Sequence, residues 1–159
     1  MTRELTHIDS AGRATMVDVS SKPVVPRRAV AEGFFVAAPG TLDRLMRGDL
    51  PKGEALAVAR LAGIQAAKST DRLIPLCHTI PLDHVDVQFE RSADDRLRVE
   101  ASAAVTSRTG VEMEALTAVS VAALTLWDMT KAIDATLRIE GITLVLKEKG
   151  PAAQPDAAS

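Results

Sequence analysis

The chain has 159 residues, of which 47% are hydrophobic and 25% are charged, so it matches one globular domain with its own core, spanning 1–159. A net charge of −2, an aromatic content of 3% and the lack of tyrosine argue against a basic, base-stacking surface for nucleic acid. The single cysteine excludes an internal disulfide, and neither a membrane-length apolar run nor an apolar export segment is present, so we expect a cytoplasmic protein.

The first half of the chain predicts one strand and two helices. The strand is expected at about 29–37, and a short helix at 41–50 follows a Pro-Gly pair. The alanine-rich stretch 54–70 predicts a longer helix, in which Gly63 allows close approach to another backbone.

The second half predicts a hairpin, a long helix and a last strand. Residues 85–89 and 97–105 alternate apolar and polar side chains and are joined by the turn sequence SADD. The helix is expected at 112–135, with acidic residues in its first turn. In the strand at 137–146 the apolar positions change from odd to even at Gly141, which indicates a β-bulge.

This order of elements predicts an α+β fold of the ferredoxin-like split βαβ type, a four-stranded antiparallel sheet with helices on one face. The small, polar composition of the two ends, about 1–14 and 150–159, predicts that they are flexible. We expect a second subunit to contribute to burial of the bare sheet face. The alternative is an ordinary solvated face.

The connector LIPLCHTIPL, residues 73–82, is a candidate site because its two prolines make it stiff. A stiff loop can hold His78 in one orientation, as a catalytic or phosphate-binding imidazole requires. For Cys77 a place in the core is the preferred interpretation. A metal site of Cys77, His78 and His84 has no recognised ligand spacing, so no metal site is predicted.

Ionisable residues mark both ends of the long helix. Asp128 and Lys131 are spaced i,i+3 and can pair, although an ordinary surface salt bridge explains the same pattern. Glu112 and Glu114 could likewise serve only the helix dipole. Glu114 and Asp128 point within about 40° of each other but lie roughly 21 Å apart along a straight helix. If both serve one site, either the ligand is long or a neighbouring subunit completes the pocket.

Further charged residues are weaker candidates. Asp18 and Lys22 lie in MVDVSSK, and Arg27 and Arg28 come next to a predicted strand. Lys52 precedes a helix start, where an ammonium and free backbone N–H groups can meet a phosphate. Neither of the standard glycine-rich nucleotide-binding motifs is present.

The chain resembles the MoaC family, the cyclic pyranopterin monophosphate synthases of molybdenum-cofactor biosynthesis, over about 5–150. The stretches that carry the resemblance are LTHIDSAGRATMVDVSSK, ARLAGIQAAKSTDRLIPLCHTIPLDHVDV and TGVEMEALTAVSVAALTLWDMTKAID. It implies a ferredoxin-like subunit in a homohexamer, a trimer of dimers, with active sites at a subunit interface. It implies a lyase that converts a cyclised dihydro-GTP, (8S)-3',8-cyclo-7,8-dihydroguanosine 5'-triphosphate, to cyclic pyranopterin monophosphate and diphosphate. No organic cofactor or redox metal is implied, and Mg²⁺ accompanying the triphosphate is left open.

The resemblance also implies roles for individual residues. Asp128, Lys131 and Lys52 match catalytic positions of the family. The implied substrate-binding residues are Leu76, Cys77, His78, Met113, Glu114, Glu112, Asp18, Arg27 and Lys147. Our hypothesis is that Lys52 and Lys131 transfer protons and that Asp128 orients Lys131.

The chain departs from the family pattern at three places. The usual glycine-rich GGKSG becomes KEKGPAAQ, TGKTG becomes TSRTG with Arg108 in place of lysine, and LCHPLPL becomes LCHTIPL. The altered tail keeps open a second hypothesis, a non-catalytic or weakly active paralogue that binds guanine nucleotides or a partner. A metal-dependent redox enzyme is a more distant third.

Overall fold

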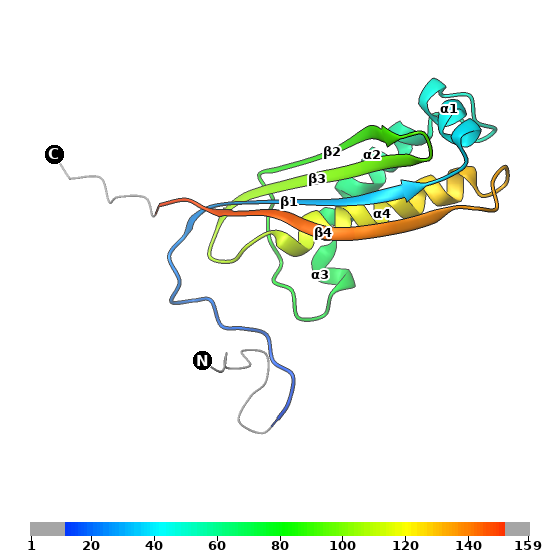
Figure 1. Cartoon of the computed structure of the whole chain (residues 1–159). Coiled ribbons are helices and arrows are strands. Elements are labelled where there is room, and N and C mark those ends of the chain that lie inside the picture. Colours follow the sequence, from blue (N-terminus) through cyan, green and yellow to red (C-terminus); the bar gives the residue numbers. More distant parts are fainter. Residues whose placement is uncertain (1–11, 152–159) are drawn as a thin grey trace.

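The structure is a computed structural model that describes residues 12–151, so most of the two ends predicted as flexible lies outside the described residues. Four strands and four helices follow one another along this part of the chain (Figure 1). They are β1 (Val25–Val36), α1 (Pro39–Arg47), α2 (Ala55–Ala67), α3 (Thr70–Leu73), β2 (His84–Ala93), β3 (Arg96–Ser107), α4 (Glu112–Thr130) and β4 (Arg138–Lys149).

The strands form one antiparallel sheet in the order β2-β3-β1-β4. Helices α2 and α4 lie together behind this sheet, on one of its faces (Figure 1). The predicted α+β, ferredoxin-like fold is therefore confirmed. No helix within residues 12–151 is both long and apolar enough to cross a membrane.

Several element boundaries differ from the predicted ones. Strand β1 begins at Val25 rather than near 29, and β4 extends to Lys149. Helix α4 ends at Thr130 rather than 135, because the chain turns there: the amide of Ile133 donates to the carbonyl of Thr130 at 2.9 Å. The predicted helix at 54–70 is also interrupted, and α3 follows α2 as a separate short turn.

The core forms where small side chains let the two helices approach the sheet. Along β3 every second residue is buried, among them Ala101 and Ala103. An ideal Cβ on Gly63 would lie only 2.9 Å from the carbonyl oxygen of Ala118 in α4. The close approach predicted for Gly63 is therefore confirmed, and any larger residue would push α2 away from α4.

The last strand carries the predicted bulge and a second one. Gly141 has φ of +60°, and the pairing of β4 with β1 shifts register beside it. A second shift leaves Val145 without a partner in the register. Beyond Gly141, the side chains of Ile142, Leu144 and Val145 are all exposed in the single chain.

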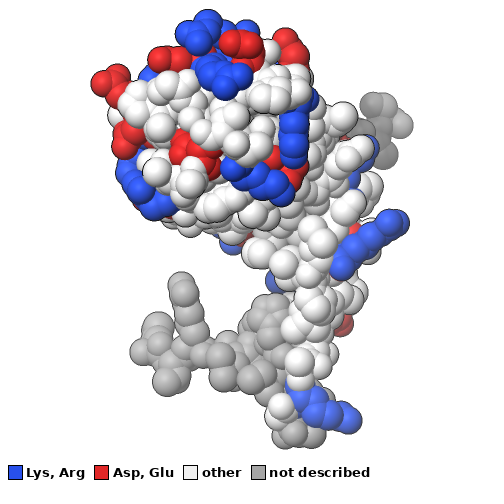
Figure 2. Space-filling model, turned by 90° about the vertical axis from the view of Figure 1, so that its right-hand side faces the viewer, with Lys and Arg blue, Asp and Glu red and all other residues white. Residues whose placement is uncertain are grey.

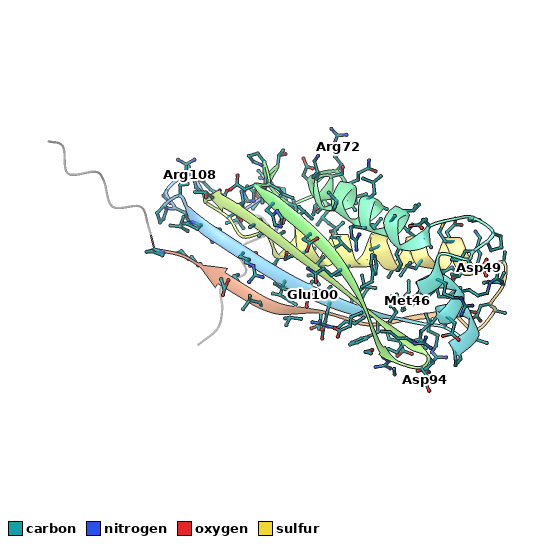
Figure 3. The ribbon with its side chains drawn as sticks, turned by 90° about the horizontal axis from the view of Figure 1, so that it is seen from above. Met46, Asp49, Arg72, Asp94, Glu100 and Arg108 are labelled. Atoms are coloured by element: carbon teal, nitrogen blue, oxygen red, sulfur yellow. The ribbon has the colours of Figure 1, made fainter. Side chains whose placement is uncertain are left out.

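The face of the sheet away from the helices is polar around β3. Arg98 pairs with Glu32 at 2.7 Å and also with Glu100, which projects from the middle of the sheet in Figure 3. Arg96 pairs with Glu140 at 3.0 Å. These ion pairs favour the solvated-face alternative for this region.

The end of the molecule formed by α1 and the β2–β3 turn carries basic and acidic side chains intermixed (Figure 2). No large patch of one charge sign is visible on this face.

Candidate active site

Two groups of candidate residues lie at opposite ends of α4. We call Lys52, Asp128 and Lys131, at the carboxyl end of the helix, the lysine cluster. We call the cavity at its amino end the N-terminal pocket. It has a volume of about 450 Å³ and is lined by Val17, Val19, Lys22, Leu76, Cys77, His78, Ile80, Thr109, Gly110, Glu112, Met113 and Glu114.

In the lysine cluster, one carboxylate binds two ammonium groups. Lys131 Nζ lies 2.6 Å from Asp128 Oδ1, which confirms the predicted i,i+3 pair. Lys52 Nζ lies 2.9 Å from Asp128 Oδ2 and donates to the Asp128 carbonyl oxygen at 2.9 Å. Lys52 reaches this point from the turn before α2, which Gly53 permits with φ of +88°. Asp128 therefore fixes the separation of two cations that come from distant parts of the sequence.

The charge state of Asp128 follows from the same contacts. Hydrogen bonds from Lys131 and Lys52, together with their positive charges, lower the pKa of Asp128 to about 2. All three side chains remain about half exposed, so a ligand can reach them. The cluster presents ammonium groups for a phosphate and for proton transfer.

The 73–82 loop forms one wall of the N-terminal pocket. His78 Nε2 lies 2.8 Å from the carbonyl oxygen of Val17, which belongs to the segment crossing the pocket before β1. Leu76 and Cys77 line the same wall. Cys77 is partly buried, and burial raises the pKa of its thiol, as do the nearby carboxylates of Glu114 and Asp71. The imidazole is thus held in one orientation, as the stiff loop predicted.

The start of α4 forms the opposite wall and contributes two carboxyl groups. Glu114 is only 3% exposed, and this burial raises its pKa to about 7, with a further contribution from the charges of Glu112 and Asp71. Glu112 instead forms an ion pair with Lys147 of β4. One carboxyl group is thus neutralised by a cation, while its neighbour can gain or lose a proton near neutral pH.

Three predicted substrate-binding residues lie outside the lining of the pocket: Lys147, which pairs with Glu112, and Asp18 and Arg27. Asp18 is exposed, and its Oδ1 accepts a hydrogen bond from the amide of Ser20 at 2.8 Å, which lowers its pKa. Arg27 donates to the carbonyl oxygens of Ser107 and Arg108, each at 2.9 Å. Arg27 therefore fixes the end of β3 that leads into the pocket, where Figure 3 marks Arg108.

Sequence reasoning assigned no role to several residues that line the pocket. Lys22 was only a weak candidate, and Val17, Val19, Ile80 and Thr109 were not singled out as site residues. The segment with Val17, Val19 and Lys22 forms neither helix nor strand, so no periodic pattern marks it. Only its place against His78 shows that it closes the pocket.

The single chain does not bring the lysine cluster and the N-terminal pocket together. Helix α4 runs without interruption from Glu112 to Thr130. At 1.5 Å per residue, Glu114 and Asp128 are roughly 21 Å apart along its axis. Within residues 12–151, no group of three or more His, Cys, Asp or Glu side chains could hold a metal ion.

Comparison with known proteins identifies the family of this chain. The family model described as "MoaC family" matches residues 16–150. Proteins named cyclic pyranopterin monophosphate synthase from Chloroflexus aggregans and Roseiflexus castenholzii are each 54% identical, and the matches cover 92% of this chain and 90% and 94% of those proteins. The synthase of Corynebacterium efficiens is 52% identical, over 92% of this chain and 94% of its own. This chain belongs to the MoaC family.

Proposed function

We propose that this protein is a cyclic pyranopterin monophosphate synthase, a phosphorus–oxygen lyase of molybdenum-cofactor biosynthesis. It acts on the cyclised dihydro-GTP triphosphate named above and releases diphosphate. The observation that carries the proposal is the lysine cluster, in which Asp128 holds Lys52 and Lys131 side by side in a chain of this family. A GTP-derived triphosphate is formed inside the cell, so the proposal includes the cytoplasmic location predicted above.

The residue types suit the reaction. Rearranging a purine into a pyranopterin moves protons on and off ring nitrogens and sugar oxygens, and the triphosphate requires cations. In our proposal Lys52 and Lys131 transfer protons, and Asp128 positions both ammonium groups rather than Lys131 alone. His78 and the carboxyl groups of the N-terminal pocket bind the purine-derived part of the substrate. These groups perform acid–base chemistry themselves, so the proposal includes no organic cofactor and no redox metal.

The second part of the proposal is that two copies of the chain build each active site. One face of α4 carries the exposed apolar residues Leu124 and Trp127, which are 58% and 38% exposed in the single chain. Val121 lies midway between Glu114 and Asp128. If two antiparallel copies of α4 cross at Val121, the N-terminal pocket of each copy meets the lysine cluster of the other. Such a pair has two identical sites, and three such pairs make the hexamer that the family resemblance implies.

Turnover of the cyclised intermediate tests the enzymatic part. The purified protein is incubated with this compound, and diphosphate and the pterin product are followed by mass. We expect both products in equal amounts. Binding without any product would support the alternative, a non-catalytic relative that binds guanine nucleotides.

Mixing two inactive variants tests the two-copy site. His78→Ala removes a group of the pocket, and Lys131→Ala removes one of the lysine cluster. After dissociation and random reassembly at equal amounts, half of the pairs are mixed, and one of the two sites in each mixed pair is intact. We therefore expect about a quarter of wild-type activity to return. Mixtures that stay inactive would show that each copy completes its own site.

A further inference from the structure

The hydrogen bond between Thr79 and Asp71 links the two ends of the segment that carries His78. Thr79 Oγ1 donates to Asp71 Oδ2 at 2.7 Å. Asp71 lies in α3, before the loop, and Thr79 directly follows His78. The bond therefore fastens the loop to α3 on one side of the imidazole, while the contact of His78 with Val17 holds it on the other.

Thr79 is also a position where this chain departs from its family. The family pattern LCHPLPL has proline directly after the histidine, whereas this chain has LCHTIPL. A proline ring fixes φ and restricts the residue before it, which here is His78. Threonine imposes neither restriction. The side-chain hydrogen bond to Asp71 restricts the loop beside His78 by a tertiary contact, whereas a proline ring restricts it covalently.

Asp71 is placed close enough to the pocket to act on groups within it. Its charge contributes, after burial, to the raised pKa values of both Cys77 and Glu114. Cys77 belongs to the loop and Glu114 to the facing helix, so the charge of Asp71 reaches both walls of the pocket. A shift of Asp71 or of the loop would change the spacing of the pocket-lining groups.

We propose that Asp71 is a positioning residue of the active site, whose carboxylate holds the 73–82 loop through Thr79 and thereby aims His78 into the N-terminal pocket. This inference rests on the proposed function, because it assigns the purpose of the contact to substrate binding. The contact itself can be tested without turnover.

Cys77 reports on the loop, because it is the only cysteine in the chain. Its rate of reaction with a thiol reagent is measured in the wild type and in Thr79→Val, Asp71→Asn and the double variant. We expect each variant to react at least about fivefold faster, since the loop opens more often, and the double variant to react no faster than Asp71→Asn. Thr79→Val separates loop opening from charge, because it leaves the Asp71 carboxylate in place.

Turnover and rescue complete the test. We expect kcat/KM for the cyclised intermediate to fall about tenfold in Thr79→Val and Asp71→Asn, with melting temperatures close to that of the wild type. Restoring the proline, in Asp71→Asn with Thr79→Pro, should return both kcat/KM and the Cys77 rate toward wild type. The control is Asp86→Ala, which removes the acceptor of a 2.7 Å side-chain bond from Gln88 on β2, away from the pocket lining. It should change neither measurement.

The outcomes separate this inference from the proposed function. If the wild type forms no product, the enzymatic proposal fails, and the Cys77 rates still decide whether Asp71 and Thr79 hold the loop. Unchanged Cys77 rates would overturn the inference. Faster reaction of Cys77 with undiminished turnover would also overturn it, because the loop would then open without displacing His78. A double variant whose loss of kcat/KM equals the sum of the losses in the two single variants would overturn it as well.

Discussion

The two ends of α4 carry carboxyl groups whose pKa values the fold shifts in opposite directions. Glu114, near the amino end, is buried, and its pKa rises to about 7. Asp128, near the carboxyl end, is exposed between two ammonium groups, and its pKa falls to about 2. One helix thus presents an acid that can exchange a proton near neutral pH and a permanent anion that positions cations. The chemistry of each end is set by its neighbours, not by the residue type.

The largest effect is expected from Lys131→Arg, which preserves the charge at the carboxyl end but removes a group that can give up its proton. If Lys131 transfers a proton, kcat should fall by a factor of about 100 or more. The melting temperature should stay close to that of the wild type, because the side chain is 58% exposed. Lys68→Arg, on the exposed end of α2, is the matched control. Full turnover by Lys131→Arg would end the assignment of proton transfer to this residue.

A smaller loss of activity is expected from Leu124→Glu, which should weaken the proposed contact between the N-terminal pocket of one copy and the lysine cluster of the other. A charge in the apolar face of α4 should weaken the pairing of copies, so activity at low protein concentration should fall by about tenfold. Raising the concentration should restore part of it. Mass and turnover are followed together over a dilution series.

The control for the pairing experiment is Met46→Glu. Met46 is an exposed apolar residue of α1, at the end of the molecule marked in Figure 3. It should leave both the mass and the turnover unchanged. If Leu124→Glu remains assembled and active, the exposed face of α4 is not the contact between copies, and the two-copy site would need another geometry.

The buried acid at the amino end predicts a pH dependence of stability. The pKa of Glu114 is raised in the folded chain, so its stabilising effect is complete below the ordinary value near 4.5 and is lost as the pH rises to about 7. Glu114→Gln lacks this titration. In separated chains, the free energy of unfolding should therefore fall by about 3 kcal/mol between pH 4.5 and 8 relative to the variant.

Denaturant unfolding of the two proteins at several pH values measures this difference. If the free energies of unfolding of the two proteins changed with pH in parallel, Glu114 would not be held protonated. The same experiment in the Leu124→Glu background sharpens the comparison of the two ends. In the assembled protein, ammonium groups of a second copy near Glu114 would lower its pKa and flatten the profile. A steeper profile in the separated chains is therefore expected.

The strands and helices were predictable where a period was sustained over many residues. The alternation along β3 and the long apolar pattern of α4 identified both elements, and the change of phase at Gly141 identified the bulge. The end of α4 was predicted five residues too late. Residues 131–135 continue to resemble a helix in composition, whereas tertiary contacts of Asp134 turn the chain there.

The site was predictable only in part, for a related reason. Residue type and spacing already marked the ionisable candidates, and the family resemblance supplied their roles. The i,i+3 spacing alone predicted the pairing of Asp128 with Lys131. The contact of Lys52 with the same carboxylate joins residues 76 positions apart, and no local pattern encodes it. No local pattern encodes the hydrogen bond between Thr79 and Asp71 either, since it depends on how the loop folds back on α3.

The pKa of Asp134 is lowered as far as that of Asp128, but by different partners. Among the variants discussed, Asp134→Ala should have the smallest effect on turnover. Burial alone would raise the pKa of Asp134, but hydrogen bonds from Thr136 and the Ala38 amide outweigh it and lower the pKa to about 2. Its contribution to stability is present above the ordinary pKa near 3.8 and is lost as the pH falls toward 2. Asp134→Ala should therefore lose about 2 kcal/mol more unfolding free energy at pH 7 than at pH 2, measured by denaturant unfolding. Turnover below the melting temperature should stay within about twofold of the wild type, whereas Asp128→Asn should lose turnover with little loss of stability. If both variants lost turnover alike, the two carboxylates at the carboxyl end of α4 would act together, and the division between a structural and a functional anion would be wrong.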